Sequence, residues 1–115
     1  MIVPGPATRI FLAPGATDLR RSFDGLYGLV GSQLAEDPRS GHLFLFCNRS
    51  GNRLKVFCFD GTGAWVCAKR LERGTFTRPE ADVGSKVRLR AEELAMLLGG
   101  RELTRVERQN WWRVE

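Results

Sequence analysis

Three short apolar runs, joined by two turn signals, constrain the fold of this chain more than any other feature. The runs are LFLFCN (43–48), RLKVFCFD (53–60) and AWVCAKR (64–70), and the turns between them are RSGN and GTG. Aromatic and aliphatic residues favour strands, whereas Asn, Ser, Gly and Asp tolerate positive φ or bond to their own backbone. The pattern predicts two successive β-hairpins, and therefore an antiparallel sheet.

A helix is expected to cover this sheet. Apolar residues recur at steps of three and four from Leu19 to Leu34, so Thr17 or Asp18 would cap a helix that runs to about Ala35. Gly25, Gly28 and Gly31 weaken it, and close backbone approach to the sheet is one reason for them. In the run at 53–60 the two faces are Leu54, Val56, Cys58 and Lys55, Phe57, Phe59. Both faces carry apolar groups, which favours a sheet that is largely covered.

Further elements complete a single α+β domain over residues 1–115, with a core at about 8–100. The expected elements are a strand at RIFLA (9–13), short edge strands at GTFTRP (74–79) and SKVRLR (85–90), and a helix at AEELAMLLGG (91–100). Residues 101–115 are expected to form a tail or a further short helix. The predicted fold is a small antiparallel sheet of hairpins packed against one main helix, with a second short C-terminal helix.

Positive charge is concentrated in the middle of the chain. Residues 49–90 hold ten Lys or Arg against four acids, whereas residues 1–48 are neutral and residues 91–115 carry a net charge of −1. In SKVRLR the alternation places Lys86, Arg88 and Arg90 on one face. A GC-rich gene would explain the preference for Arg over Lys but not this clustering.

These basic residues are expected to gather near one edge of the sheet. Arginine forks onto phosphate oxygens, and clustered cations bind DNA with release of counterions. The candidate nucleic-acid-binding residues are Arg49, Arg53, Lys55, Lys69, Arg70, Arg73 and Arg78. A solvated basic rim is the alternative. Arg20 and Arg21 lie at the expected helix start, where an anion, or Asp18 and Asp24, would offset the unfavourable dipole.

No catalytic site is predicted. A nuclease would need clustered acids to hold metal ions. The acids available to it are Asp18, Asp24, Asp37, Asp60 and Asp82. The cap at Asp18, a pair between Asp24 and Arg20 or Arg21, and the turn at Asp60 each give a structural alternative.

No metal or cofactor site is predicted either. Cys47, Cys58 and Cys67 are odd in number, form no CxxC pair and fall on three different strands. They are therefore expected to be buried, free and slow to react. His42 lies in a turn-like segment with no nucleophile beside it, so it forms no catalytic triad.

The order of four motifs resembles one protein family. RRSFDGL, NRSGNRLK, FDGTGAW and KRLERGTF follow one another within DLRRSFDGL (18–26) and residues 43–76, and EELAMLLGG (92–100) comes after them. Over about residues 8–100 the chain resembles the small accessory protein, of TnpB type or second open reading frame, of bacterial insertion sequences of the IS66 class. The resemblance implies a non-catalytic role in transposition, beside a separate transposase that cuts the strands. The tail after Gly100 departs from that family, so Trp111 and Trp112 gain no role from it.

Two mechanisms suit such an accessory protein. It binds DNA, at the ends of the element, through the basic sheet-edge patch, or it is an adaptor that binds the transposase or a second copy of itself. Aromatic residues would then make the adaptor contact, although aromatics in strands are more often core. The aromatic candidates are Phe57, Phe59, Trp65, Phe76, Trp111 and Trp112. A helix-turn-helix over 91–106 is a third reading.

The expected location is the cytoplasm. No apolar run approaches the roughly 18 residues of a membrane span. The N-terminus lacks a basic region, and its apolar stretch is broken by Pro4, Pro6 and Pro14, so no secretory signal is predicted.

Overall fold

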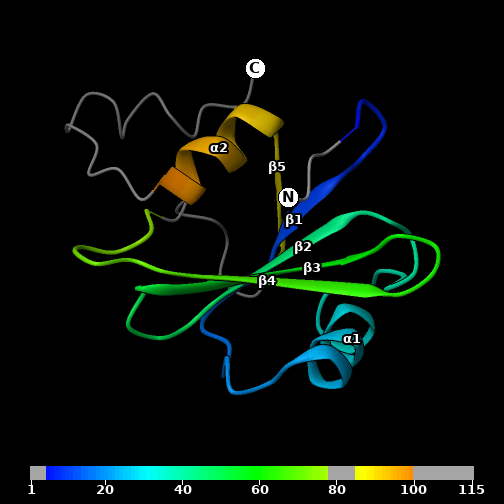
Figure 1. Cartoon of the computed structure of the whole chain (residues 1–115), viewed down its shortest axis with the longest axis horizontal. Helices are drawn as coiled ribbons and strands as arrows, with labels where there is room; N and C mark the ends of the chain where they lie inside the picture. Colours follow the sequence, from blue (N-terminus) through cyan, green and yellow to red (C-terminus); the bar gives the residue numbers. More distant parts are fainter. Residues whose placement is uncertain (1–4, 78–84, 100–115) are drawn as a thin grey trace.

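The described part of the chain folds as a five-stranded sheet with one helix on each face. The computed structural model describes residues 5–77 and 85–99. The elements in chain order are β1 (Ile10–Leu12), α1 (Phe23–Ser32), β2 (Leu43–Cys47), β3 (Arg53–Phe59), β4 (Ala64–Arg70), β5 (Val87–Leu89) and α2 (Ala91–Gly99). The strands lie in the order β4-β3-β2-β1-β5. Figure 1 shows α1 on one side of the sheet and α2 on the other. The α+β class and the short second helix are confirmed.

The two predicted hairpins are present and in continuous register. β2 pairs antiparallel with β3, and β3 with β4, so that Phe57 lies opposite both Phe44 and Val66. Gly51 and Gly61 take positive φ in the two turns, at 75° and 99°. An L side chain rarely adopts this conformation, so glycine at these positions lets each turn close.

The sheet is not wholly antiparallel, which corrects the prediction in one respect. β1 pairs in parallel with β2, with Ile10 opposite Leu43, and α1 lies in the connection between them. A parallel neighbour requires a long crossover rather than a tight turn, and the helical segment supplies it. The carboxyl ends of β1 and β2 therefore lie at the same end of the sheet. The segments that follow these two strands can then form the walls of a cleft.

Two apolar cores lie on the two faces of the sheet. The core under α2 includes Leu43, Leu45 and Cys47, and the core under α1 includes Phe44 and Phe46. All five residues of β2 are buried because this central strand is covered on both sides. A short strand that is apolar at every position is typical of this arrangement.

The helix α1 is shorter than predicted at both ends. It begins at Phe23 rather than Thr17 or Asp18, because the Asp18 carboxylate accepts the backbone N–H of Arg20 at 3.1 Å and forms a turn there instead. The close-approach explanation for its glycines is wrong for Gly28 and Gly31, where a Cβ atom would meet open space. At Gly25 a Cβ would meet the Arg21 side chain and not the sheet.

The predicted edge strand at 74–79 is absent over the part that the structure describes. Residues 74–77 form an irregular segment in which buried Phe76 donates its N–H to Gly51 O at 2.7 Å. The predicted strand at 85–90 is confirmed as β5. Lys86, in this segment, lies over the Phe11 ring and forms an ion pair with Glu36. This cation therefore has structural partners. No helix among the described residues is long and apolar enough to cross a membrane.

Candidate nucleic-acid interface

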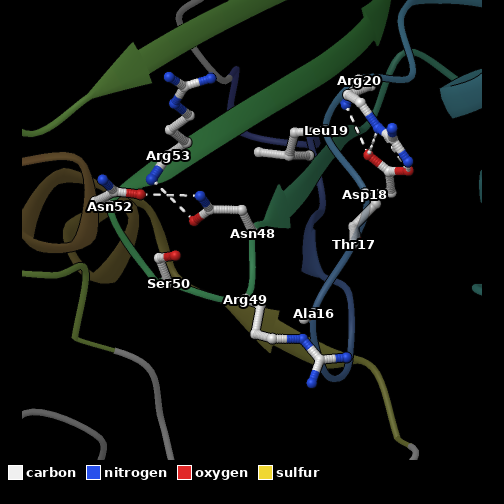
Figure 2. Close-up of a pocket in the computed structure, with 10 residues that line it drawn as sticks. All are labelled: Ala16, Thr17, Asp18, Leu19, Arg20, Asn48, Arg49, Ser50, Asn52 and Arg53. Carbon is white, nitrogen blue, oxygen red and sulfur yellow. Dashed lines mark hydrogen bonds and ion pairs between the residues drawn. The ribbon is translucent and has the colours of Figure 1, made fainter.

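An open cleft of about 650 Å³ lies where β1 and β2 end. Its two walls are the segment after β1 and the turn between β2 and β3 (Figure 2). The residues that line it are Ala16, Thr17, Asp18, Leu19, Arg20, Asn48, Arg49, Ser50, Asn52 and Arg53. Thr17 donates its N–H to Cys47 O at 2.7 Å, and so the first wall runs alongside the end of β2.

Asn48 holds the second wall in place. Its Oδ1 accepts the N–H of Arg53 at 3.0 Å, and its Nδ2 donates to Asn52 Oδ1 at 2.9 Å. The Asn48 N–H also donates to Arg53 O, at 3.1 Å. These bonds close the turn on itself, so Arg49 and Arg53 project from a fixed backbone.

Arg49 and Arg53 carry the unpaired charge of this cleft. Both are exposed, and neither side chain has a hydrogen-bond or ion-pair partner within residues 5–77 and 85–99 (Figure 2). Arg20 is different, because its guanidinium binds Asp18 at 2.7 Å. Hydrogen bonds from Arg20 lower the pKa of Asp18 from 3.8 to about 2, so this acid is ionised at neutral pH. The pair leaves Arg20 largely neutralised.

A second cleft of about 340 Å³ adjoins the first, because Arg53 and Leu19 line both. Its other residues are Leu54, Lys55, Ala68, Lys69 and Arg70. Arg53 lies directly opposite Arg70 in the β3–β4 ladder, so the two cations share one face of the sheet. Like charges in this position are destabilising. Within the described residues, Arg70 has no acid partner, so nothing there relieves the repulsion.

The geometry of the ladder brings Arg53 and Arg70 close together. Leu71 N–H donates to Asn52 O, and Asp60 N–H donates to Gly63 O, which identifies the hydrogen-bonded pairs at both ends of the hairpin. Hydrogen-bonded and non-hydrogen-bonded pairs alternate along an antiparallel ladder. Arg53 and Arg70 are next to the hydrogen-bonded Asn52–Leu71 pair, and they therefore form a non-hydrogen-bonded pair. Such pairs have Cα atoms about 4.5 Å apart, with the side chains at their closest. Two guanidinium forks at this spacing are suited to hold one phosphate group.

Lys55 and Lys69 line the second cleft but have structural partners. Lys55 Nζ donates to Arg21 O at 2.8 Å, which ties β3 to the segment before α1. Lys69 Nζ donates to Leu98 O at 2.6 Å, in the last turn of α2. A cation at a helix C-terminus also stabilises the helix dipole. These two lysines are therefore less available to a ligand than the three arginines.

The remaining predicted residues are not gathered into the clefts. Arg73 is exposed after β4 and lines neither of them, and Arg78 lies outside the described residues. Sequence reasoning missed Asn48 and Asn52 as cleft residues, and it considered Arg20 only as a cation at the helix start that an anion or Asp18 would offset. The signal for them was the polar sequence NRSGN after one strand and DLR after another, but it has meaning only when β1 and β2 are known to be parallel.

The Thr17 hydroxyl is a further polar group at this cleft. Its Oγ1 is buried and has no hydrogen-bond partner in the described part of the chain. A buried hydroxyl without a partner costs roughly 1–3 kcal/mol. Thr17 thus adds a buried polar group to the residues that line the cleft.

The acids, cysteines and histidine that were weighed for catalysis or metal binding form no metal-binding group in the described part of the chain. Within residues 5–77 and 85–99 no three His, Cys, Asp or Glu side chains form a group that would hold a metal ion. Asp60 serves its turn, where it accepts Thr62 N, Gly63 N and Trp65 Nε1. These bonds hold the pKa of Asp60 well below its usual range, and the backbone N–H of Thr62 has the largest effect. His42 Nδ1 accepts the N–H of Arg9 at 2.9 Å.

The cysteines and aromatic residues divide by exposure. Cys47 is buried and Cys58 partly buried, but Cys67 is exposed on β4, which corrects the prediction that all three are buried. Phe57 and Phe76 are core residues, and Trp65 is 55% exposed. Of the aromatic candidates for an adaptor contact that the structure describes, Trp65 is the most accessible; Trp111 and Trp112 lie outside the described residues.

Comparison with known proteins gives one family and two similar relatives. The family model described as IS66 Orf2 like protein matches residues 8–108. The uncharacterized protein y4jC of Sinorhizobium fredii is 38% identical over 109 residues, which cover 95% of this chain and 92% of that protein. The uncharacterized protein y4hO of the same organism is 39% identical over 100 residues, 87% of this chain and 86% of that protein. No solved structure matches.

Proposed function

Because this chain belongs to the IS66 Orf2-like family, we propose that it is a non-catalytic accessory protein of transposition that binds the DNA backbone. The two adjoining clefts form the binding surface, with Arg49, Arg53 and Arg70 as the phosphate ligands. The transposase, as a separate protein, carries out the strand cutting.

The observation that carries the proposal is the Arg53–Arg70 pair. Two like charges opposite each other on neighbouring strands oppose folding, and a phosphate between them turns this repulsion into attraction. Arg49 extends the charge along the first cleft from the fixed β2–β3 turn. Phosphate contacts of this kind position a protein on DNA without selecting a sequence. Recognition of the element ends then requires base contacts or the transposase.

The alternative is an adaptor that contacts the transposase and not DNA. Exposed Trp65 favours it, since large exposed aromatics are common at the centres of protein interfaces. The helix-turn-helix reading needs a second helix after α2, and those residues lie outside the described part of the chain. α2 itself packs on the sheet through Leu94 and Leu97.

One experiment distinguishes DNA binding from the adaptor role. The purified protein is titrated onto duplex DNA at several salt concentrations, and transposition is measured with and without its gene. The proposal expects an association constant that falls steeply with salt, by about 0.9 logarithmic units per phosphate contact for each tenfold rise. Transposition that depends on the gene, together with transposase binding and no DNA binding, would establish the adaptor role instead.

The substitution Asp18→Asn is expected to strengthen DNA binding. The amide oxygen still accepts the Arg20 N–H, but the anion at the cleft is lost and the Arg20 guanidinium is released. One added phosphate contact should raise affinity about threefold to tenfold and steepen the salt dependence by about 0.9. Because the pKa of Asp18 is about 2, mild acid leaves the pair intact, and the substitution is needed to break it.

Asp37→Asn is the matched control for this variant. Asp37 accepts the Arg39 N–H at 2.9 Å in a similar turn, but it lines neither cleft. Equal gains in affinity from both substitutions would mean that net charge, and not the cleft, decides DNA binding.

A further inference from the structure

β4 is an unprotected edge of the sheet. It pairs with β3 on one side, and no described strand pairs with its other side. Natural edge strands are usually short, bulged, proline-containing or heavily charged, which prevents pairing with other chains. β4 has seven residues, no proline and an unbroken register, and charge is confined to Lys69 and Arg70 at its end. Such an edge is suited to receive another strand.

The outward backbone groups of β4 follow from its hydrogen bonds to β3. Gly63 O accepts from Asp60, and Leu71 N–H donates to Asn52, so the odd-numbered residues point toward β3. Backbone groups of alternate residues point in opposite directions in an antiparallel ladder. The free N–H and C=O groups of the edge therefore belong to four even-numbered residues: Ala64, Val66, Ala68 and Arg70.

The side chains on the α2 side of this edge are also accessible. Trp65 is 55% exposed and Cys67 is exposed, and Asp60 Oδ2 fixes the indole by accepting from Nε1 at 2.7 Å. Beside them lies an apolar groove of about 290 Å³ between the sheet and α2. Its lining residues are Leu43, Leu54, Val56, Cys67, Ala68, Lys69, Leu94 and Leu98. The indole of a tryptophan from another chain would suit the apolar wall of this groove.

We propose that β4 pairs antiparallel with β4 of a second copy, with the two-fold axis at Cys67. Cys67 is the midpoint of Ala64–Arg70, so this register overlaps the whole of both strands. Val66 then exchanges hydrogen bonds with Ala68 of the second copy, and Ala64 with Arg70. All the outward backbone groups of the strand are satisfied in this way.

The side-chain pairs of this register are complementary. Trp65 lies opposite Lys69 of the second copy, which suits a cation–π contact at the mouth of the apolar groove. Cys67 lies opposite its own equivalent in a non-hydrogen-bonded pair, where Cα atoms are about 4.5 Å apart. A parallel arrangement in register would instead place Arg70 against Arg70. The strand is thus self-complementary in the way a two-fold interface requires.

The pairing joins the two sheets into one continuous sheet. The two Arg70 side chains lie at opposite ends of the paired β4 strands. The Arg70 residues of the two copies are six positions apart along the strands, or about 20 Å. The inference stands on the geometry of the edge and does not need DNA binding. A failure of either proposal leaves the other intact.

Thiol oxidation tests the register. The reduced full chain is treated with diamide, where two Cys67 thiols lose two protons and two electrons, form one disulfide, and reduce diamide to its hydrazine. A dimer that dithiothreitol reverses is expected within minutes, because Cys67 geometry in this register matches a disulfide. In a Cys67→Ser/Thr62→Cys control the exposed cysteine lies five residues from the axis, and cross-linking should be at least about tenfold slower. Equal rates would mean random collision and would overturn the proposal.

Mass under reducing conditions tests the interface without a covalent bond. Sedimentation equilibrium should give a dimer for the wild type and for Ala68→Ser. It should give a monomer for Ala68→Pro. Proline removes the N–H that points away from β3, so the bonds between β4 and β3 are kept. If circular dichroism shows that Ala68→Pro is unfolded, Trp65→Lys replaces it, since this change places Lys against Lys69. A wild type that stays monomeric, or a folded variant that still dimerises, would contradict the proposal.

Discussion

Replacement of both Arg53 and Arg70 by glutamine is expected to lower the affinity for duplex DNA about 100-fold near physiological salt. A hydrogen bond to a charged group contributes roughly 1.5 kcal/mol, and two such losses amount to about two factors of ten. The slope of log affinity against log salt should fall by about 1.8, because two phosphate contacts are removed. A fluorescence titration at four or five salt concentrations measures both quantities.

The same double variant is expected to fold at least as stably as the wild type. Both side chains are exposed and without an acid partner in the described residues, and their mutual repulsion is removed. Urea denaturation should give an unchanged or slightly higher midpoint. A marked loss of stability would mean that the pair has a structural partner, and the DNA result could not then be assigned to lost contacts.

A second double variant separates the clefts from overall charge. Arg9 and Arg88 are exposed, lie at the β1–β5 side of the sheet and line neither cleft. Arg9→Gln/Arg88→Gln removes the same two charges, and its affinity should fall severalfold at most. Equal losses in the two double variants would remove the clefts from the binding surface.

Phe44→Ala is expected to destabilise the fold by about 4 kcal/mol, as large-to-small substitutions of buried aromatics do. Phe44 is fully buried on the central strand and stacks on Phe11 with ring centroids 5.8 Å apart. A domain of this size has a total stability of about 5–15 kcal/mol, so the variant should unfold at a much lower urea concentration.

Phe23→Ala is the control for this substitution. Phe23 is the first residue of α1 and is 50% exposed, so its loss should cost less than about 1 kcal/mol. Similar losses at the two positions would contradict the assignment of Phe44 to the core under α1.

Local pattern was sufficient to predict much of this fold. The hairpin signals predicted β2, β3 and β4 to within one residue at each end, because turn residues and strand residues act over a few positions. The stop at Gly99 and the leucine spacing predicted α2. The length of α1 was predicted less well, since Asp18 is as suitable for a turn as for a cap.

The candidate site was predicted only in part. The clustering of charge indicated the hairpin end, and five of the seven predicted residues line the two clefts. Sequence alone could not distinguish Lys55 and Lys69 from the arginines. Their carbonyl partners lie 34 and 29 residues away along the chain.

What the sequence by itself determined is the set of hairpins, the α+β class, and the sign and location of the charge, because each depends on neighbouring residues. The tertiary structure decided the parallel pairing of β1 with β2, and with it the meeting of two strand ends that builds the first cleft. It also decided that β4 lies at one edge of the described sheet, with β5 at the other. Strand order depends on burying both faces of the sheet at once, which is a property of the whole chain and of no single segment.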